Sequence, residues 1–223
     1  MEEATKKKVI FHVTGFGKFQ GVASNPTTCI IQELPRYLEE NPLTETAAEI
    51  KSMTVLETSG VGSLCSLSEL HLRKNRLTPS EQERTSVVWL HLGVACSQND
   101  FKLERVAWNE AHFRCCDERE WRPCHQPIYP EHGSTEHYQT TDIPVYTIQE
   151  QLKQLDFDVQ ISEDPGRFVC NWIYYHSLHF SSLDRCSSSL FVHVPPFEAI
   201  PLPQQLAFVR QLIQLLAVHF KTE

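Results

Sequence analysis

Short apolar runs recur along the chain, with helical patterns between them. Four of these runs have the length of buried strands: three are apolar and rich in β-branched residues, and one alternates apolar with polar positions. They lie at residues 9–13, 87–92, 157–161 and 190–194. A weaker fifth strand is predicted at residues 53–56.

Between the strands, apolar residues recur three or four positions apart, as on one face of a helix. The first helix is predicted to begin at Asn25 and Pro26, because asparagine is a favoured N-cap and proline is favoured at the first helical position. Three further helices are predicted from Leu64, Leu67 and Leu70, from Ile148, Leu152 and Leu155, and from about Pro203 onward.

This alternation predicts an α/β fold, a three-layer αβα sandwich with a mainly parallel sheet. The length of 223 residues suits one domain spanning 1–223. Residues 78–86 are predicted to be a loop. Residues 117–143 lack periodicity and are rich in Pro, His, Gly and Thr, so they are predicted to form a long irregular segment, either a flap or a surface loop.

Composition narrows the function classes. Hydrophobic residues make up 41% and charged residues 22%, which excludes disorder, collagen and coiled coil. The net charge of −8 has the wrong sign for a general binder of nucleic acid or anionic membranes. The charged N-terminus, Met1 to Lys8, contains no apolar signal region, and the expected location is cytoplasmic. Eight irregularly spaced cysteines without a C-x-x-C pair indicate reduced thiols.

Cys170 is the first candidate for chemistry. A turn near Gly166 separates the strand at 157–161 from an apolar helical stretch that begins at Trp172. Cys170 is therefore predicted at or near a helix N-terminus, where unpaired N–H groups and the helix dipole favour a thiolate and could stabilise an oxyanion. A buried structural cysteine is the alternative interpretation.

His193 and Glu104 could complete a catalytic group. His193 lies near the end of an apolar strand, and an imidazole can serve a thiol as base. Glu104 could hold that imidazole in one orientation. The alternatives are a packed histidine and a glutamate paired with Lys102 or Arg105.

The glycines at 15, 17 and 21 follow the first strand, but their spacing matches neither a dinucleotide-binding motif nor a P-loop. Phe16 and Phe19 are therefore interpreted as walls of a small apolar pocket. The alternative is an ordinary connection between a strand and a helix.

A zinc site could be drawn from histidines and cysteines in or near the irregular segment. Their spacing fits no compact ligand pattern, so neither a metal nor another cofactor is expected. The residues considered are Cys115, Cys116, Cys124, His125, His132 and His137.

Taken together, four sequence blocks resemble the pyroglutamyl-peptidase I (pyrrolidone-carboxylate peptidase) family in order and spacing, over nearly the whole chain. They are Thr14-Gly15-Phe16-x-x-Phe19 with Asn25-Pro26-Thr27, Glu104-Arg105-Val106-Ala107-x-Asn109, Ser162-x-x-x-Gly166-x-Phe168-Val169-Cys170-Asn171 with Tyr174, and Phe191-Val192-His193-Val194-Pro195.

The resemblance implies a twisted mixed sheet flanked by helices (phosphorylase/hydrolase-like) and a cysteine-type omega-peptidase. It would cleave after the N-terminal pyroglutamyl residue of small peptides through a thioester, without metal or cofactor. Cys170 would be the nucleophile, His193 the base and later the acid, and Glu104 the orienting group. The substrate-binding residues implied are Phe16, Phe19, Asn25 and Val169.

Two other functions stay open at this point. Pro165 replaces an alanine of the family pattern and Lys18 replaces a proline, and the segment 94–98 lacks the glycines common in bacterial members. A catalytically impaired member that acts as a binding or regulatory protein is therefore one alternative. A metal-dependent hydrolase that uses the loop histidines and cysteines is the other. The sequence does not specify an oligomeric state.

Overall fold

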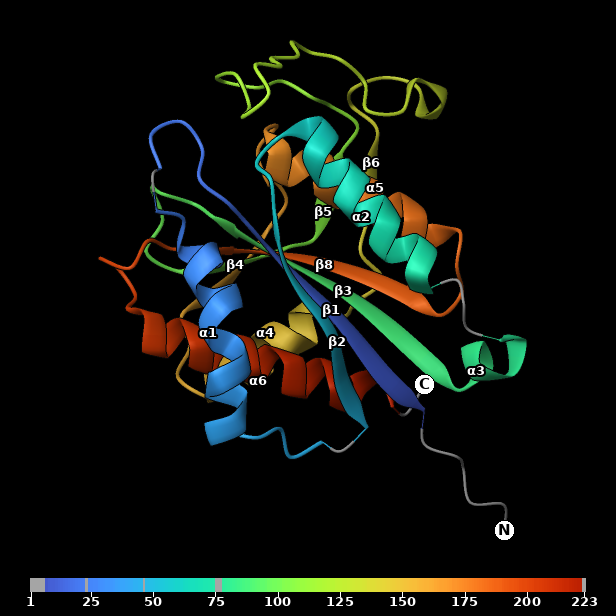
Figure 1. Ribbon diagram of the computed structural model, residues 1–223, viewed down its shortest axis with the longest axis vertical. Coiled ribbons are helices and arrows are strands. Elements are labelled where there is room, and N and C mark those ends of the chain that lie inside the picture. Colours follow the sequence, from blue (N-terminus) through green and yellow to red (C-terminus); the bar gives the residue numbers. More distant parts are fainter. Residues whose placement is uncertain (1–6, 23, 46, 75–77, 222–223) are drawn as a thin grey trace.

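A six-stranded sheet forms the centre of the protein (Figure 1). The computed structural model describes residues 7–22, 24–45, 47–74 and 78–221, so most of the charged N-terminus lies outside the described residues. The strand order is β2-β1-β3-β8-β4-β7. The strands are β1 (Lys8–Phe16), β2 (Ala48–Leu56), β3 (Thr85–Val94), β4 (Phe101–Glu104), β7 (Val159–Ser162) and β8 (Ser187–Val194).

All pairings in this sheet are parallel except that between β4 and β8. Helices cover both faces: α1, α4 and α6 lie on one side, and α2 and α5 on the other (Figure 1). Their bounds are α1 (Pro26–Glu40), α2 (Gly60–Lys74), α4 (Val145–Gln154), α5 (Val169–Ser182) and α6 (Leu202–Phe220). The predicted three-layer α/β fold with a mainly parallel, mixed sheet is confirmed. Within the described ranges, no helix combines the length and the apolar character that crossing a lipid bilayer requires.

Two hydrophobic cores lie on the two faces of the sheet, because side chains alternate along a strand. In β1, Val9, Phe11 and Val13 pack toward α1, α4 and α6, whereas Ile10 and Phe16 belong to the core beneath α2 and α5. Phe16, at the end of β1, therefore lies on the face of the sheet that α2 and α5 cover.

The prediction of a loop over residues 78–86 is wrong. A short helix, α3 (Pro79–Glu83), begins there, and β3 starts at Thr85. Thr78 caps α3 by a capping box, in which its backbone N–H donates to the Glu81 carboxylate (2.8 Å). Five residues are too few to show an apolar stripe, and the first two residues of β3 are polar although they are buried.

The segment 117–143 is largely irregular, with a single 3-10 turn (Pro130–His132) and the strand β6 (Tyr138–Thr140), which pairs with β5 (Val106–Trp108). Its side chains contact both helices on this face of the sheet, α2 and α5. The Asp117 carboxylate accepts a hydrogen bond from Gly60 N at the start of α2 (2.8 Å). His132 and His137 each contact the Tyr175 hydroxyl of α5 through Nδ1 (2.7 and 2.8 Å).

Candidate active site

Cys170 is the second residue of α5, whose N-cap is Phe168, and its side chain is half-buried. It thus lies at a helix N-terminus, as the sequence predicts. Gly166, in the turn before the helix, has φ +77°, a left-handed conformation that glycine adopts without strain. Pro165 precedes this glycine and leaves the start of α5 intact.

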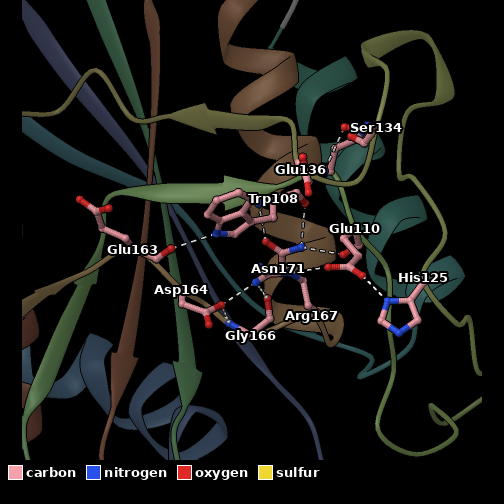
Figure 2. A network of polar contacts seen from close by, with 11 residues as sticks. Trp108, Glu110, His125, Ser134, Glu136, Glu163, Asp164, Gly166, Arg167 and Asn171 are labelled. Carbon is pink, nitrogen blue, oxygen red and sulfur yellow. Dashed lines mark hydrogen bonds and ion pairs between the residues drawn. The ribbon is translucent and has the colours of Figure 1, made fainter.

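Two polar side chains of α5 anchor its first turns, and the contacts of one of them, Asn171, are drawn in Figure 2. The buried amide of Asn171 accepts a hydrogen bond from Trp108 N (2.8 Å) and donates to Trp108 O (2.8 Å) and Glu110 O (2.9 Å). The Tyr174 hydroxyl donates to the backbone oxygen of Glu104 (2.7 Å). Both residues belong to the sequence block around Cys170, but the sequence alone assigned them no role. The structure shows that they tie the helix carrying Cys170 to the segment carrying Glu104.

His193 and Glu104 meet across the antiparallel pairing of β8 and β4. His193 Nδ1 lies 2.7 Å from Glu104 Oε1, and the two residues are 8% and 1% exposed. In this register Lys102 faces His193 and Glu104 faces Phe191. Glu104 is therefore the diagonal neighbour of His193 on the same face, within reach of its ring.

The charge state of His193 follows from its neighbours. Burial acts to lower its pKa, but the hydrogen bonds and charges of Cys170 and Glu104 outweigh burial and raise the pKa of His193 to about 10. The imidazole is therefore protonated at neutral pH. Because Nδ1 faces Glu104, Nε2 is the nitrogen left for Cys170.

The side chains of Cys170 and His193 share a cavity of about 420 Å³. It lies where β1, β3 and β8 end, at the start of α5, as expected for a site at the carboxyl ends of parallel strands. The residues that line it are Phe16, Phe19, Asn25, Thr58, Val94, Ala95, Cys96, Ser97, His112, Arg114, Pro165, Gly166, Arg167, Phe168, Cys170 and His193.

Three of the four predicted pocket residues line this cavity. Phe16 ends β1 and is 2% exposed, and the ring of Phe19 packs against Phe168 (6.0 Å between centroids). The side chain of Asn25 caps α1 and donates to Gly17 O (2.9 Å), which holds the connection that carries both phenylalanines.

The fourth predicted pocket residue, Val169, lies elsewhere. It is the first residue of α5, is fully buried in the core of that face, and is outside the cavity lining found among the described residues. We assign it a packing role beneath the site. Lys18 is exposed and also outside that lining. Its charge therefore does not make the cavity polar at Phe16 and Phe19.

Gly93 is a site residue that sequence reasoning missed. It pairs with His193 in the register of β3 and β8. A Cβ at this position would lie 2.7 Å from Phe191 Cζ and 3.1 Å from Cys170 Sγ. A glycine inside a strand signals such a close approach, but the predicted strand ends at residue 92 and the observed β3 runs to Val94, so the signal emerges only with the true end of the strand.

We expect Gly93→Ala to lower kcat/KM about tenfold and to cost about 1–3 kcal/mol of unfolding free energy, because the new methyl group displaces Cys170 and Phe191. Steady-state kinetics and urea unfolding measure the two effects. In the control Gly17→Ala, the added Cβ meets its nearest atom at 3.5 Å, and unfolding should change by less than about 0.5 kcal/mol. A Gly93→Ala protein with unchanged kinetics would contradict the close approach.

Apart from Cys170 and His193, three potential metal ligands come together among the described residues. The ligand atoms of His112, Cys124 and His125 all lie within 4.8 Å of one another. Sequence reasoning considered the last two but not His112. The other candidates considered from the sequence are not part of this group: Cys115, Cys116, His132 and His137.

A family model described as pyroglutamyl peptidase matches residues 7–209. This chain belongs to the pyroglutamyl peptidase family. The membership confirms the family and the enzyme class expected from the four sequence blocks. The protein is thus a hydrolase of the cysteine peptidase type.

Relatives and solved structures agree with the assignment. The chain is 30% identical over 197 residues to a pyrrolidone-carboxylate peptidase of Brevibacillus brevis, covering 87% of this chain and 80% of the relative. The corresponding protein of Fusobacterium nucleatum is 28% identical, with coverages of 90% and 81%.

Two crystal structures named pyrrolidone carboxyl peptidase share the fold. That from Fervidobacterium islandicum AW-1 has a TM-score of 0.74 at 24% identity and covers 94% of this chain and 98% of its own. That from Thermus thermophilus has a TM-score of 0.72 at 25% identity, with coverages of 92% and 98%. The α/β architecture therefore matches that of solved family members.

Proposed function

We propose that this protein hydrolyses the amide bond that follows an N-terminal pyroglutamyl residue in small peptides, with Cys170 as the nucleophile. The observation that carries the proposal is that Cys170 and His193 line one apolar-walled cavity, with His193 Nδ1 2.7 Å from Glu104 Oε1. The names of the relatives support the choice of substrate.

In this proposal the Cys170 thiolate attacks the pyroglutamyl carbonyl beside the protonated His193 ring. Backbone N–H groups at the start of α5 stabilise the oxyanion. The C–N bond then breaks as His193 gives its proton to the leaving amine, and a thioester on Cys170 remains. His193 next takes a proton from water, the resulting hydroxide attacks the thioester, and pyroglutamate leaves. Glu104 keeps Nδ1 occupied and balances the positive charge of the ring.

The cavity walls support selectivity for a cyclised residue. A pyrrolidone ring is flat and uncharged, so the apolar faces of Phe16 and Phe19 suit it. A free N-terminal ammonium in the same position would lose its hydration without gaining a partner, which is costly. Asn25 contributes by holding the connection between the two walls.

We further propose a cytoplasmic setting, in which a thiol nucleophile stays reduced. All eight cysteines are free, which suits a reducing compartment. The net charge of −8 speaks against nucleic acid or anionic membranes as partners.

The test is a matched pair of fluorogenic amides, pyroglutamyl and prolyl, assayed with freshly reduced protein. The two five-membered rings differ in the lactam carbonyl and in the charge of the ring nitrogen. We expect kcat/KM to favour the pyroglutamyl amide by about 10²-fold or more, because the prolyl ammonium must be desolvated. Equal rates would contradict the substrate assignment. Complete inactivity of the reduced protein would favour the impaired family member instead.

A further inference from the structure

Two segments of chain pair with each other beside the cavity. Ala111 and Gln126 exchange backbone hydrogen bonds (2.7 and 3.1 Å) in an isolated antiparallel bridge. In such a pairing the residue after one partner faces the residue before the other, so His112 is opposite His125. Their rings stack with centroids 3.9 Å apart and an interplanar angle of 17°.

Cys124 adds a sulfur to this histidine pair. Its Sγ and one nitrogen of each ring all lie within 4.8 Å of one another. Around a tetrahedral zinc ion, neighbouring ligand atoms are about 3.5 Å apart, as Zn–N and Zn–S bonds of about 2.0 and 2.3 Å require. The side chains of Cys124 and His125 are exposed, so core packing does not fix them at the wider spacing.

Both rings have features that ligands to a metal need. His112 Nδ1 is buried and has no hydrogen-bond partner among the described residues. His125 Nδ1 contacts Glu110 Oε1 (2.5 Å), so the opposite nitrogen points away from the carboxylate (Figure 2). A carboxylate behind a histidine is the usual way in which proteins orient a metal ligand. Glu110 is itself held by Arg167 Nε (2.9 Å).

We propose that His112, Cys124 and His125 bind a divalent transition-metal cation of the zinc class, with water in the fourth position. One thiolate and two imidazoles suit zinc and cobalt, and they do not suit magnesium or calcium. Binding replaces the proton on Cys124 Sγ, which is released to solvent, with a sulfur–metal bond.

The site adjoins the peptidase cavity without sharing its nucleophile. The side chain of His112 lines the cavity, and its backbone N–H donates to Arg167 O (3.1 Å), on the approach to α5. A bound ion would therefore link the cavity wall at His112 to the segment that carries Cys124. The ion is expected to raise the melting temperature, since the assembled site binds it more tightly than the unfolded chain does.

The experiment must separate this site from the catalytic thiol, because Cys170 and His193 could also bind zinc. The Cys170→Ser protein is therefore the background, kept reduced with a phosphine and titrated with cobalt(II) while its absorption is recorded. We expect one bound equivalent, a tetrahedral cobalt spectrum and a thiolate-to-cobalt charge-transfer band.

Two substitutions in this background test the ligands. Cys124→Ser should remove the charge-transfer band and weaken cobalt affinity about tenfold or more. His125→Asn should weaken affinity similarly. Asparagine is chosen because His125 has φ +47°, a left-handed conformation that asparagine tolerates. The control Cys116→Ser replaces a half-buried cysteine of the same region outside the ligand group and should keep the band.

Two results would overturn the metal site. One is a charge-transfer band and affinity that survive Cys124→Ser. The other is the absence of bound cobalt at about 1 mM, a concentration at which even a weak site fills. Circular dichroism of the ion-free variants verifies folding, and the His125→Asn protein provides an independent answer if Cys124→Ser folds poorly. None of these results depends on turnover, so they leave the proposed peptidase activity untouched.

Discussion

Cys170→Ala is expected to lower kcat/KM for a pyroglutamyl amide by at least about 10³-fold, because it removes the sulfur on which the acyl intermediate forms. The measurement is steady-state release of the fluorophore by freshly reduced protein. Iodoacetamide should inactivate the parent protein to the same degree, and a chelator should leave it active.

The matched control for this substitution is Cys186→Ala. Cys186 lies just before β8, where its Sγ contacts Asp184 (3.1 Å), away from the cavity lining. Its replacement should leave kcat/KM unchanged. Activity that persists in Cys170→Ala would refute the assignment of the nucleophile. Loss of activity with a chelator would favour the alternative function, a metal-dependent hydrolase.

Glu104→Gln is expected to lower kcat/KM on the order of 10³-fold, because the amide keeps the shape of the side chain and removes its charge. The second oxygen of Glu104, Oε2, has no hydrogen-bond partner among the described residues. The carboxylate therefore acts chiefly on His193. Without that charge the imidazolium loses one of the two groups that keep it protonated.

The pH profile of Glu104→Gln gives a second readout. Burial lowers the pKa of His193, while Cys170 and Glu104 raise it to about 10, so removing the carboxylate lets this pKa fall. The protonated form of His193 is lost as pH rises through its pKa. Because that pKa is lower in Glu104→Gln, the alkaline limb of kcat/KM should move to lower pH. Glu40→Gln, which removes an exposed partner of Arg36, is the control and should move neither limb. An unshifted alkaline limb would show that Glu104 does not set the charge of His193.

The parts of the structure that the sequence predicted are those that depend on neighbouring residues. Asn25 and Pro26 mark the start of α1 by capping chemistry that involves only neighbouring residues. Cys170 was placed at a helix N-terminus by the turn at Gly166 and the apolar stretch that follows it. Such features depend on a few adjacent residues, so one sequence is enough to show them.

Contacts between distant segments could not be predicted in the same way. The strand β4 has only four residues, FKLE, too few for their apolar–polar alternation to identify a strand, yet it is the strand that carries Glu104 to His193. The resemblance to a family implied that these two residues act together, but the antiparallel register that joins them is a property of the folded sheet. His112 was overlooked for the same reason, because its partner His125 faces it only through the bridge at Ala111.

The antiparallel insertion of β4 beside β8 also bears on the order of folding. Glu104 and His193 are 89 positions apart, and β3 pairs with β8 across a similar stretch of chain, with Val87 opposite Ser187. Closing loops of this size costs chain entropy before the contacts repay it, so pairings of this kind form slowly. We therefore expect catalytic competence to be acquired late, after the helices and the first parallel strands have assembled, so that recovery of activity marks the completion of refolding.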